Sequence, residues 1–354
     1  MRKIEVTNFA GELKSGGLLS RRTFAFGAVM SLTVPAAPAA SGPRVDMPFT
    51  SAAVPPTFVP KFKQLADGSW MPDDEAAWLR VEQLSDEFDG ASIDRSKWAL
   101  RYQAGWDHFN DEFQRYRDEN VILRAGGLEL TAVNQPGLFV DAGKNPDRTL
   151  KPRRYTDDTV CPLFHSGMIR SLTPHKYVYE EIMAKLPTGL GVWAAWWGIP
   201  VKGPGGAPNL EWDFAEWYDF GPNQWQMEGY NISMHGTQPR QLVWADPCFA
   251  RKPRLTVPGA PKTYFADGPH RYQRLWLPDD TITYAIDGVP VAMYKFPWLY
   301  NNGSTPVGMG TILNLAIGGS TVTKGLANKV DLATKIFRIE YIRAFQKPGC
   351  VLGA

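Results

Sequence analysis

A long series of short apolar runs, many of them alternating with polar residues, most constrains the fold of this chain. The runs are rich in aromatic and β-branched residues and lie between residues 84 and 345. They include GLELTAV at 127–133, KYVYEEIMAKL at 176–186, GVWAAWW at 191–197, TITYAID at 281–287, GTILNLAI at 310–317 and IFRIEYIRAF at 336–345. Period-two alternation is typical of half-buried β-strands. Many short strands over roughly 260 residues favour a single all-β sandwich.

Turn residues and charge agree with a globular β protein. The chain has 33 Gly and 29 Pro among 354 residues, which favours turns over long helices. The formal charge is +2, of which residues 1–40 contribute +3 through five basic and two acidic residues, leaving −1 for the rest. No basic stripe remains in residues 41–354, so we expect no nucleic-acid partner.

Residues 1–40 contain the parts of an export signal. Arg21 and Arg22 precede an apolar stretch at 25–34, and small residues follow at 36–40. This order is typical of a signal peptide, and the apolar stretch is too short to span a bilayer. The SRRTF context resembles the twin-arginine signal, which implies export of a folded protein to the periplasm or the medium. The alternative is an N-terminal amphipathic stretch with a chance Arg pair.

Residues 41–80 and the cysteines add little chemistry. The segment 41–80 is rich in Pro, Ala and Ser, and we interpret it as a linker or an arm extended over the surface of a domain at 81–354. Three cysteines, Cys161, Cys248 and Cys350, do not make a disulfide framework. One bridge or three unpaired thiols both stay open, and no CxxC or HExxH motif indicates a transition metal.

The sequence EWDFAE at 211–216 is the strongest candidate for chemistry. In a strand, Glu211 and Asp213 share one face. Strict alternation would turn Glu216 toward the core, where an unpaired carboxylate is costly. A β-bulge near residues 214–215 would return Glu216 to the carboxylate face. The sequence therefore predicts a bulged strand that presents both glutamates and Asp213 together.

Two glutamates on one face suit glycoside hydrolysis. Four strand steps separate their Cα atoms by roughly 13 Å, and side chains that lean together could bring the carboxyls to about 5–6 Å. That separation is close to what a retaining glycosidase needs. The alternative is a solvated acidic strand or loop. The large aromatics Trp212, Phe214 and Trp217 between the carboxylates favour the site over the loop.

A tryptophan-rich run precedes the acidic strand. Alternation in GVWAAWW places Trp193 and Trp197 on one face and Trp196 on the other. Core packing is the alternative for each ring. If this strand lies beside EWDFAE, one row of Trp rings would flank the carboxylates. Flat apolar rings beside polar groups suit the C–H face of a sugar, so polysaccharide is the expected partner.

Further blocks follow in a fixed order along the chain. They are DEFDG at 86–90, IDRSKW at 93–98, NDEFQRY at 110–116, ENVILRAGGLELTA at 119–132, SGMIRS at 166–171, AIDGVPV at 285–291, LNLAIGG at 313–319 and FRIEYIRAFQ at 337–346. Together with GVWAAWW and EWDFAE, they resemble glycoside hydrolase family 16, the laminarinase-like β-jelly-roll enzymes. The resemblance implies a β-jelly-roll sandwich of the concanavalin A-like lectin/glucanase type, with DEFDG in its opening strand.

The resemblance also implies residue roles. Glu211 would be the nucleophile, Glu216 the acid/base, and Asp213 a modulator of the Glu211 charge and of proton traffic. The implied sugar-binding residues of the cleft are Trp193, Trp197, Asn110, Glu112 and His235. The reaction would be a double displacement with retention.

Departures from the family pattern leave the substrate open. The family often has Pro where Ala194 stands, and Trp212 and Trp217 replace its usual aliphatic residues. We expect β-1,3-glucan, with β-galactan, a bacterial exopolysaccharide or transglycosylation as alternatives. A non-catalytic carbohydrate-binding jelly roll is the alternative from another class, and a structural envelope protein is a third.

We expect no cofactor for the reaction. A structural calcium is an option, since some family members hold one on the convex face and Glu340 stands at the closing-strand position that they use. The mature protein is expected to be a monomer with no membrane association.

Overall fold

The computed structural model describes residues 62–348 with internal gaps, all within the unit Gly42–Ala354. The gaps are 65, 67–69, 73–77, 109, 145–149, 155–157, 201–210, 220–229, 236–240, 246–253, 256–264, 266–267, 279–280, 296–299, 302–304, 307 and 324–326. The predicted export signal, Cys248 and Cys350 lie outside these residues, so the signal and any bridge stay predictions. Within the described residues, no helix is long and apolar enough to cross a bilayer.

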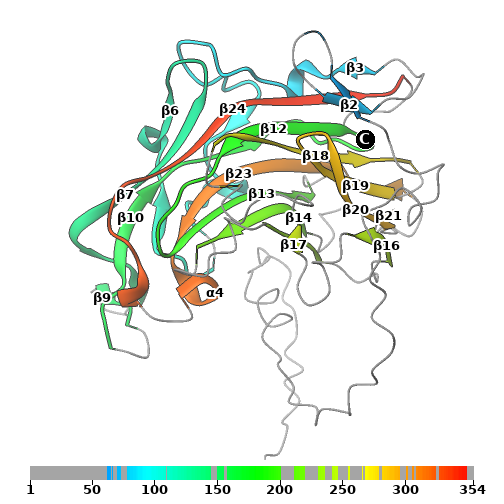
Figure 1. The fold of residues 1–354 in the computed structure, drawn as a ribbon. Coiled ribbons are helices and arrows are strands. Elements are labelled where there is room, and N and C mark those ends of the chain that lie inside the picture. Colours follow the sequence, from blue (N-terminus) through cyan, green and yellow to red (C-terminus); the bar gives the residue numbers. More distant parts are fainter. Residues whose placement is uncertain are drawn as a thin grey trace, which may run out of the picture. The chain divides into compact units, whose positions relative to one another are not determined.

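Two large sheets dominate the described part of the chain (Figure 1). The seven-stranded sheet has the order β17 (Arg254–Leu255), β15 (Tyr230–His235), β14 (Glu211–Tyr218), β13 (Val192–Pro200), β23 (Met309–Ile317), β11 (Met168–Ser171) and β4 (Trp98–Ala99). Its neighbouring strands are antiparallel, and β13 lies between β14 and β23 along nearly its whole length. The predicted Trp-rich strand and acidic strand are therefore neighbours.

The second sheet has eleven described strands. Its order is β16 (Gln241–Ala245), β20 (Val289–Lys295), β19 (Thr281–Ile286), β18 (His270–Trp276), β12 (Tyr179–Lys185), β24 (Lys335–Gln346), β7 (Leu128–Phe139), β10 (Pro162–Ser166) and β5 (Gln114–Tyr116), with β3 (Leu79–Arg80) beside β24 and β6 (Val121–Leu123) beside β7. The edge strand β5 pairs parallel with β10. This arrangement confirms the predicted all-β sandwich.

The remaining described elements are short. Three hairpins are β1 (Phe62–Gln64) with β2 (Trp70–Pro72), β8 (Asp141–Lys144) with β9 (Leu150–Pro152), and β21 (Tyr300–Asn301) with β22 (Thr305–Pro306). The helical turns are η1 (Glu82–Leu84), η2 (Gln103–Gly105), η3 (Asp118–Asn120), α4 (Gly319–Thr323) and η5 (Ala327–Lys329).

The main core lies between the two sheets. One buried cluster joins Trp196 and Trp212 of the seven-stranded sheet to Ile182, Tyr272 and Phe337 of the other. Each fully buried side chain of this size stabilises the fold by about 1.5–3 kcal/mol. The alternation in the sequence sorts the residues, so that one face of each strand enters this cluster. The opposite face of the seven-stranded sheet does not contribute to this cluster and is available for a functional site.

The segment before residue 81 is part of the packed structure. Met71 of the β1–β2 hairpin is buried against Tyr179, Leu275 and Phe345, in a cluster separate from the main core. The strand β3 pairs with the end of β24, so the eleven-stranded sheet starts two residues before the domain boundary that we expected. The strands β1 and β2 therefore cover the face of the eleven-stranded sheet that turns away from the main core.

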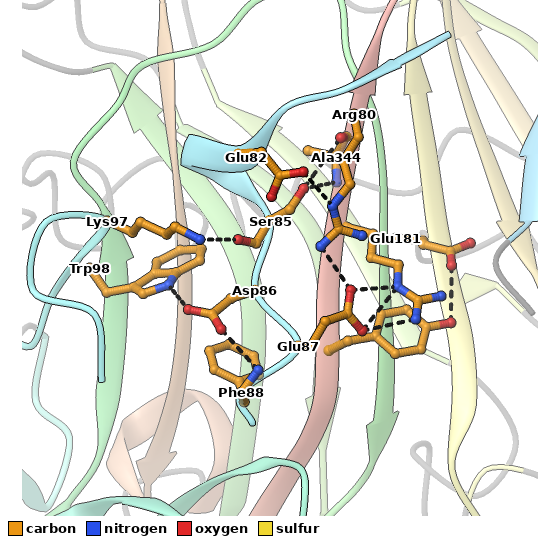
Figure 2. A network of polar contacts seen from close by, with 12 residues as sticks. Arg80, Glu82, Ser85, Asp86, Glu87, Phe88, Lys97, Trp98, Glu181 and Ala344 are labelled. Atoms are coloured by element: carbon orange, nitrogen blue, oxygen red, sulfur yellow. Dashed lines mark hydrogen bonds and ion pairs between the residues drawn. The ribbon is translucent and has the colours of Figure 1, made fainter. Parts of the chain in front are cut away.

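The predicted opening strand is largely irregular, which corrects the expectation for DEFDG. Asp86 makes only an isolated bridge to Ile342. Its carboxylate instead accepts hydrogen bonds from the Trp98 indole over 2.8 Å and from the backbone of Phe88 over 2.9 Å (Figure 2). These side-chain bonds compete with a strand ladder for the backbone and bend the chain.

Glu87 ties this opening segment to the closing strand. Its carboxylate accepts from Arg80 Nη2 over 2.8 Å and from Arg343 Nη2 of β24 over 2.8 Å, and Figure 2 shows the Arg80 contact. Burial raises the pKa of Glu87, but the hydrogen bonds and charges of Arg343 and Arg80 outweigh it and hold that pKa below its ordinary value of 4.5.

Candidate active site

Strand β14 contains the predicted bulge. In the register with β13, Trp196 is the partner of Ala215, and the next residue, Trp197, is the partner of Asp213. Phe214 is therefore the extra residue of β14, opposite no residue of β13. The register with β15 also gains one residue between Asp213 and Glu216. The prediction of a bulge near residues 214–215 is confirmed.

The bulge puts the three carboxylates on one face. An extra residue reverses the alternation beyond it. Ala195, Trp197 and their partners Glu216 and Asp213 share the face that turns away from the main core, and Glu211 lies two residues from Asp213 on that face. Asp213 is 4 % exposed and Glu216 is 9 % exposed. Asp213 and Glu216 are therefore largely shielded from water, and Glu211 at the start of the strand is partly exposed.

The interleaved aromatics take the opposite face. Trp212, Phe214 and Trp217 are each at most 1 % exposed and belong to the main core cluster. Trp196 of β13 joins them, as alternation predicted. These rings anchor β14 from behind.

Trp193 contacts the acidic strand directly. Its indole Nε1 donates to Oε1 of Glu216 over 3.1 Å. Its ring packs against Tyr218, two residues beyond Glu216, with centroids 5.4 Å apart and planes at 47°. Trp193 thus fixes the carboxyl of Glu216 in orientation, and the expected proximity of this ring to the carboxylates is found.

Trp197 belongs to a second polar group on the same face. Its indole Nε1 donates to Oδ1 of Asn314 over 2.6 Å, and Asn314 Nδ2 donates to the hydroxyl of Tyr116 over 2.8 Å. The ring of Tyr102 packs against both Trp197, at 5.9 Å, and Tyr116, at 5.6 Å. Asn314 of β23 thus holds Trp197 in place, and Tyr116 of β5 in turn holds Asn314.

The network continues to two predicted sugar-binding residues. Gln114 Nε2 donates to the Tyr116 hydroxyl over 3.1 Å and to Oε2 of Glu112 over 2.6 Å. Asn110 Nδ2 donates to the other oxygen of Glu112 over 3.2 Å. Burial raises the pKa of Tyr116 well above 10, and the neighbouring Tyr102 and Glu112 add to the shift. Tyr116 is therefore a neutral hydroxyl within this relay.

The structure thus divides the predicted site residues into two groups. Glu211, Asp213, Glu216 and Trp193 form one group on β13 and β14, and Trp197, Glu112 and Asn110 form the other. His235 is the Cα partner of Glu211 in the register of β14 with β15, and its side chain lies outside the described part.

Sequence reasoning missed four members of the second group. Asn314, Tyr116, Gln114 and Tyr102 carry bonds or ring contacts to predicted residues. Asn314 had a local signal, because it is a polar residue in the middle of the apolar run GTILNLAI. The others depend on contacts between strands far apart in the chain.

The described residues were also compared with the requirements of a metal site. Among the described residues, no three His, Cys, Asp or Glu side chains are grouped so that they could hold a metal ion. The calcium option near Glu340 stays a prediction, as does the absence of a cofactor.

Comparisons with known proteins point to glucanases. No family model matches the chain. It is 27% identical over 285 residues to glucan endo-1,3-β-glucosidase A1 of Niallia circulans, covering 74% of this chain and 37% of that protein. It is 23% identical over 267 residues to an endo-1,3-1,4-β-glycanase of Rhizobium meliloti, covering 74% and 49%, and 27% identical over 272 residues to a β-glucanase of Rhodothermus marinus, covering 72% and 80%. The chain thus spans between a third and a half of the first two relatives.

Solved structures share the fold. A non-specific endo-β-1,3(4)-glucanase from family GH16 superposes with a TM-score of 0.54 at 22% identity, covering 81% of this chain and 96% of that one. An endo-β-1,3-glucanase from Pyrococcus furiosus gives a TM-score of 0.53 at 20% identity, covering 82% and 99%. The expected likeness in fold to glycoside hydrolase family 16 is confirmed.

The same comparison identifies the fold of the described sandwich. The two-sheet architecture is that of the family-16 β-jelly-roll, and the match extends over about four fifths of the chain.

Proposed function

We propose that the chain is an endo-acting retaining glycoside hydrolase that cleaves β-1,3-glucan after export from the cytoplasm. The observation that carries the proposal is the bulge at Phe214, which brings Glu216 to the face of Glu211 and Asp213. A carbohydrate-binding module needs aromatic platforms but not an ordered row of three carboxylates. The names of the relatives, which are glucanases of β-1,3 and mixed linkage, support the same reaction class.

The proposed mechanism is a double displacement. Glu211 attacks the anomeric carbon and forms a covalent glycosyl-enzyme, while Glu216 protonates the leaving oxygen. Glu216 then takes a proton from water, which attacks the same carbon from the face that the leaving group vacated and breaks its bond to Glu211, so that the Glu211 carboxylate is restored. The net result is retention of the β configuration. Asp213, between the two on the same face, modulates the charge of Glu211.

The surrounding residues orient these groups and the sugar. The Trp193 indole holds one oxygen of the Glu216 carboxyl, so this group stays aimed as it changes from acid to base. The ring of Trp197, held by Asn314 and only 3 % exposed, supports Asp213 from the neighbouring strand. Asn110, partly exposed at the end of the relay, supplies a polar group for sugar hydroxyls, and the buried Glu112 orients it.

The test is hydrolysis by the purified chain from about Ala40 onward. New reducing ends are followed on β-1,3-glucan, mixed-linkage glucan and β-galactan, and the anomer released first is read by proton NMR. Glu211→Gln and Glu216→Gln are expected to lose activity by about 10²–10⁴-fold with polymer binding kept. Glu119→Gln, at an exposed carboxylate in η3, is the matched control and keeps full activity.

Other outcomes would redirect the proposal. Cleavage of β-galactan alone would keep the mechanism and change the substrate. Release of the α-anomer first would contradict retention. Binding to a polymer without cleavage by the wild-type chain on all substrates would identify a non-catalytic carbohydrate-binding protein instead.

A further inference from the structure

A complete ion pair is buried in the core directly behind the acidic strand. Arg274 of β18 and Glu180 of β12 are register partners, both 0 % exposed, and their side chains form a salt bridge. Thr311 of β23 donates to Glu180 over 3.0 Å, and Arg274 Nη2 donates to Nε2 of His175 over 2.6 Å. Apolar residues often replace such a buried pair without loss of stability, so stability alone does not explain it.

The guanidinium of Arg274 faces aromatic rings of the seven-stranded sheet. Its Cζ lies 3.7 Å from the ring centroid of Phe214, 4.8 Å from that of Trp212 and 5.7 Å from that of Trp196. Its Nε and Nη1 find no hydrogen-bond acceptor among the described residues. The guanidinium of Arg274 therefore makes cation–π contacts with these rings, and the shortest of these contacts is to Phe214.

Phe214 is the extra residue of the bulge, and its ring has a close-fitting site. A Cβ atom on Gly198 of β13 would lie 2.9 Å from Phe214 Cζ and 2.7 Å from the carbonyl oxygen of Gly310. Trp212 and Trp196 meet the ring edge-on, at 4.7 Å and 5.3 Å. The ring is thus enclosed by Gly198 and two Trp side chains, with the cation of Arg274 over its face.

We propose that Arg274 and Phe214 are positioning residues that hold the bulge of β14 in place, with Glu180 orienting Arg274. A one-residue slip of a strand turns all its side chains to the other face. Without a fixed position for Phe214, the bulge can move along β14, and Glu216 loses its place beside Glu211 and Asp213. This inference rests on the proposed function for its effect on rate, but its structural part can be tested without catalysis.

The first experiment compares two Phe→Leu variants of the purified chain. Phe214→Leu removes the aromatic ring at the bulge. Phe337→Leu, in β24, removes an equally buried ring that packs on Trp217 of β14, away from the bulge. Both are expected to lower the melting temperature by similar amounts. Phe214→Leu alone is expected to lower kcat by roughly 10²-fold with KM little changed, since a misplaced catalytic group costs about that much.

The second experiment removes the cation. Arg274→Met with Glu180→Met deletes both charges at once, so that neither is left unpaired in the core. It is expected to fold and to lose kcat in the same way as Phe214→Leu. Arg274→Lys keeps a charge for Glu180 but not the planar guanidinium, and an intermediate kcat is expected.

Hydrogen exchange of the β14 amides gives a readout that does not depend on activity. Faster exchange at residues 211–218 is expected in Phe214→Leu and in the double Met variant, but not in Phe337→Leu. Equal exchange in all variants would overturn the proposal, as would equal kcat per folded molecule in the two Leu variants. If the wild type hydrolyses no polymer, the proposed function fails, and the exchange comparison still decides whether Arg274 and Phe214 hold the bulge.

Discussion

The indole of Trp193 donates a hydrogen bond to Oε1 of Glu216 over 3.1 Å, across two neighbouring strands. Both residues are only 9 % exposed, so water competes weakly for this bond. The contact therefore fixes the orientation of the carboxyl group that we propose as acid and base.

Trp193→Phe tests this relationship. The substitution keeps a ring against Tyr218 but removes the donor to Glu216. The Glu216 carboxyl is then no longer held in one orientation, and kcat is expected to fall by roughly 10–100-fold because a catalytic group is misplaced. Trp78→Phe, in the segment ahead of β3, is the control and leaves kcat unchanged. An unchanged kcat in Trp193→Phe would show that the bond does not position Glu216.

Asn314→Leu tests the second polar group. The variant keeps the side-chain volume but removes the acceptor for Trp197 and the donor to Tyr116. We expect KM to rise because the Trp197 ring is no longer fixed, and the free energy of unfolding to fall by about 2 kcal/mol. Tyr116→Phe leaves the Asn314 bond to Trp197 intact, so its KM should change less. Equal KM values in the two variants would contradict a role for Asn314 in placing Trp197.

The bulge could be predicted from the sequence because it follows from a local cost. Strict alternation would have put Glu216 in the core without a partner, and one extra residue near Phe214 removes that penalty. The structure places the extra residue there. The alternation of Trp193, Trp196 and Trp197 likewise needed only the period of a strand.

Contacts across the sandwich could not be predicted in the same way. The bond from Asn314 to Tyr116 joins residues 198 positions apart, and its formation depends on how β5 and β23 meet in space. The buried pair behind β14 had a partial signal, since alternation forces one of the adjacent Glu180 and Glu181 to face inward. Nothing local indicated that the inward carboxylate would meet Arg274.

Glu87→Gln is expected to weaken the fold at neutral pH and to matter less in acid. The pKa of Glu87 in the folded chain lies below its ordinary value, so its contribution is present above about pH 4.5 and is lost as the pH falls through the folded value. Melting temperatures of variant and wild type should converge between about pH 7 and pH 3. Glu82→Gln, at a carboxylate whose side chain is 67% exposed and contacts Arg80, is the control. A constant offset at every pH would contradict the role of the Glu87 ion pairs.

His175 is expected to make the fold sensitive to mild acid. Burial lowers the pKa of His175 well below 6.5, and the charge of Arg274 lowers it further. Because Nε2 accepts from Arg274, the folded chain holds His175 neutral, with its proton on Nδ1. Below about pH 6.5 the unfolded chain binds a proton that the folded chain does not, so stability falls with pH by up to about 1.4 kcal/mol per unit.

His175→Gln removes that titration and keeps an oxygen that can accept from Arg274. Urea unfolding at several pH values between about 5 and 7 should therefore show a flatter dependence of the free energy of unfolding in the variant than in the wild type. If the His175 variant keeps the wild-type slope, the loss of stability in acid arises elsewhere, and the buried histidine already carries its proton in the folded chain.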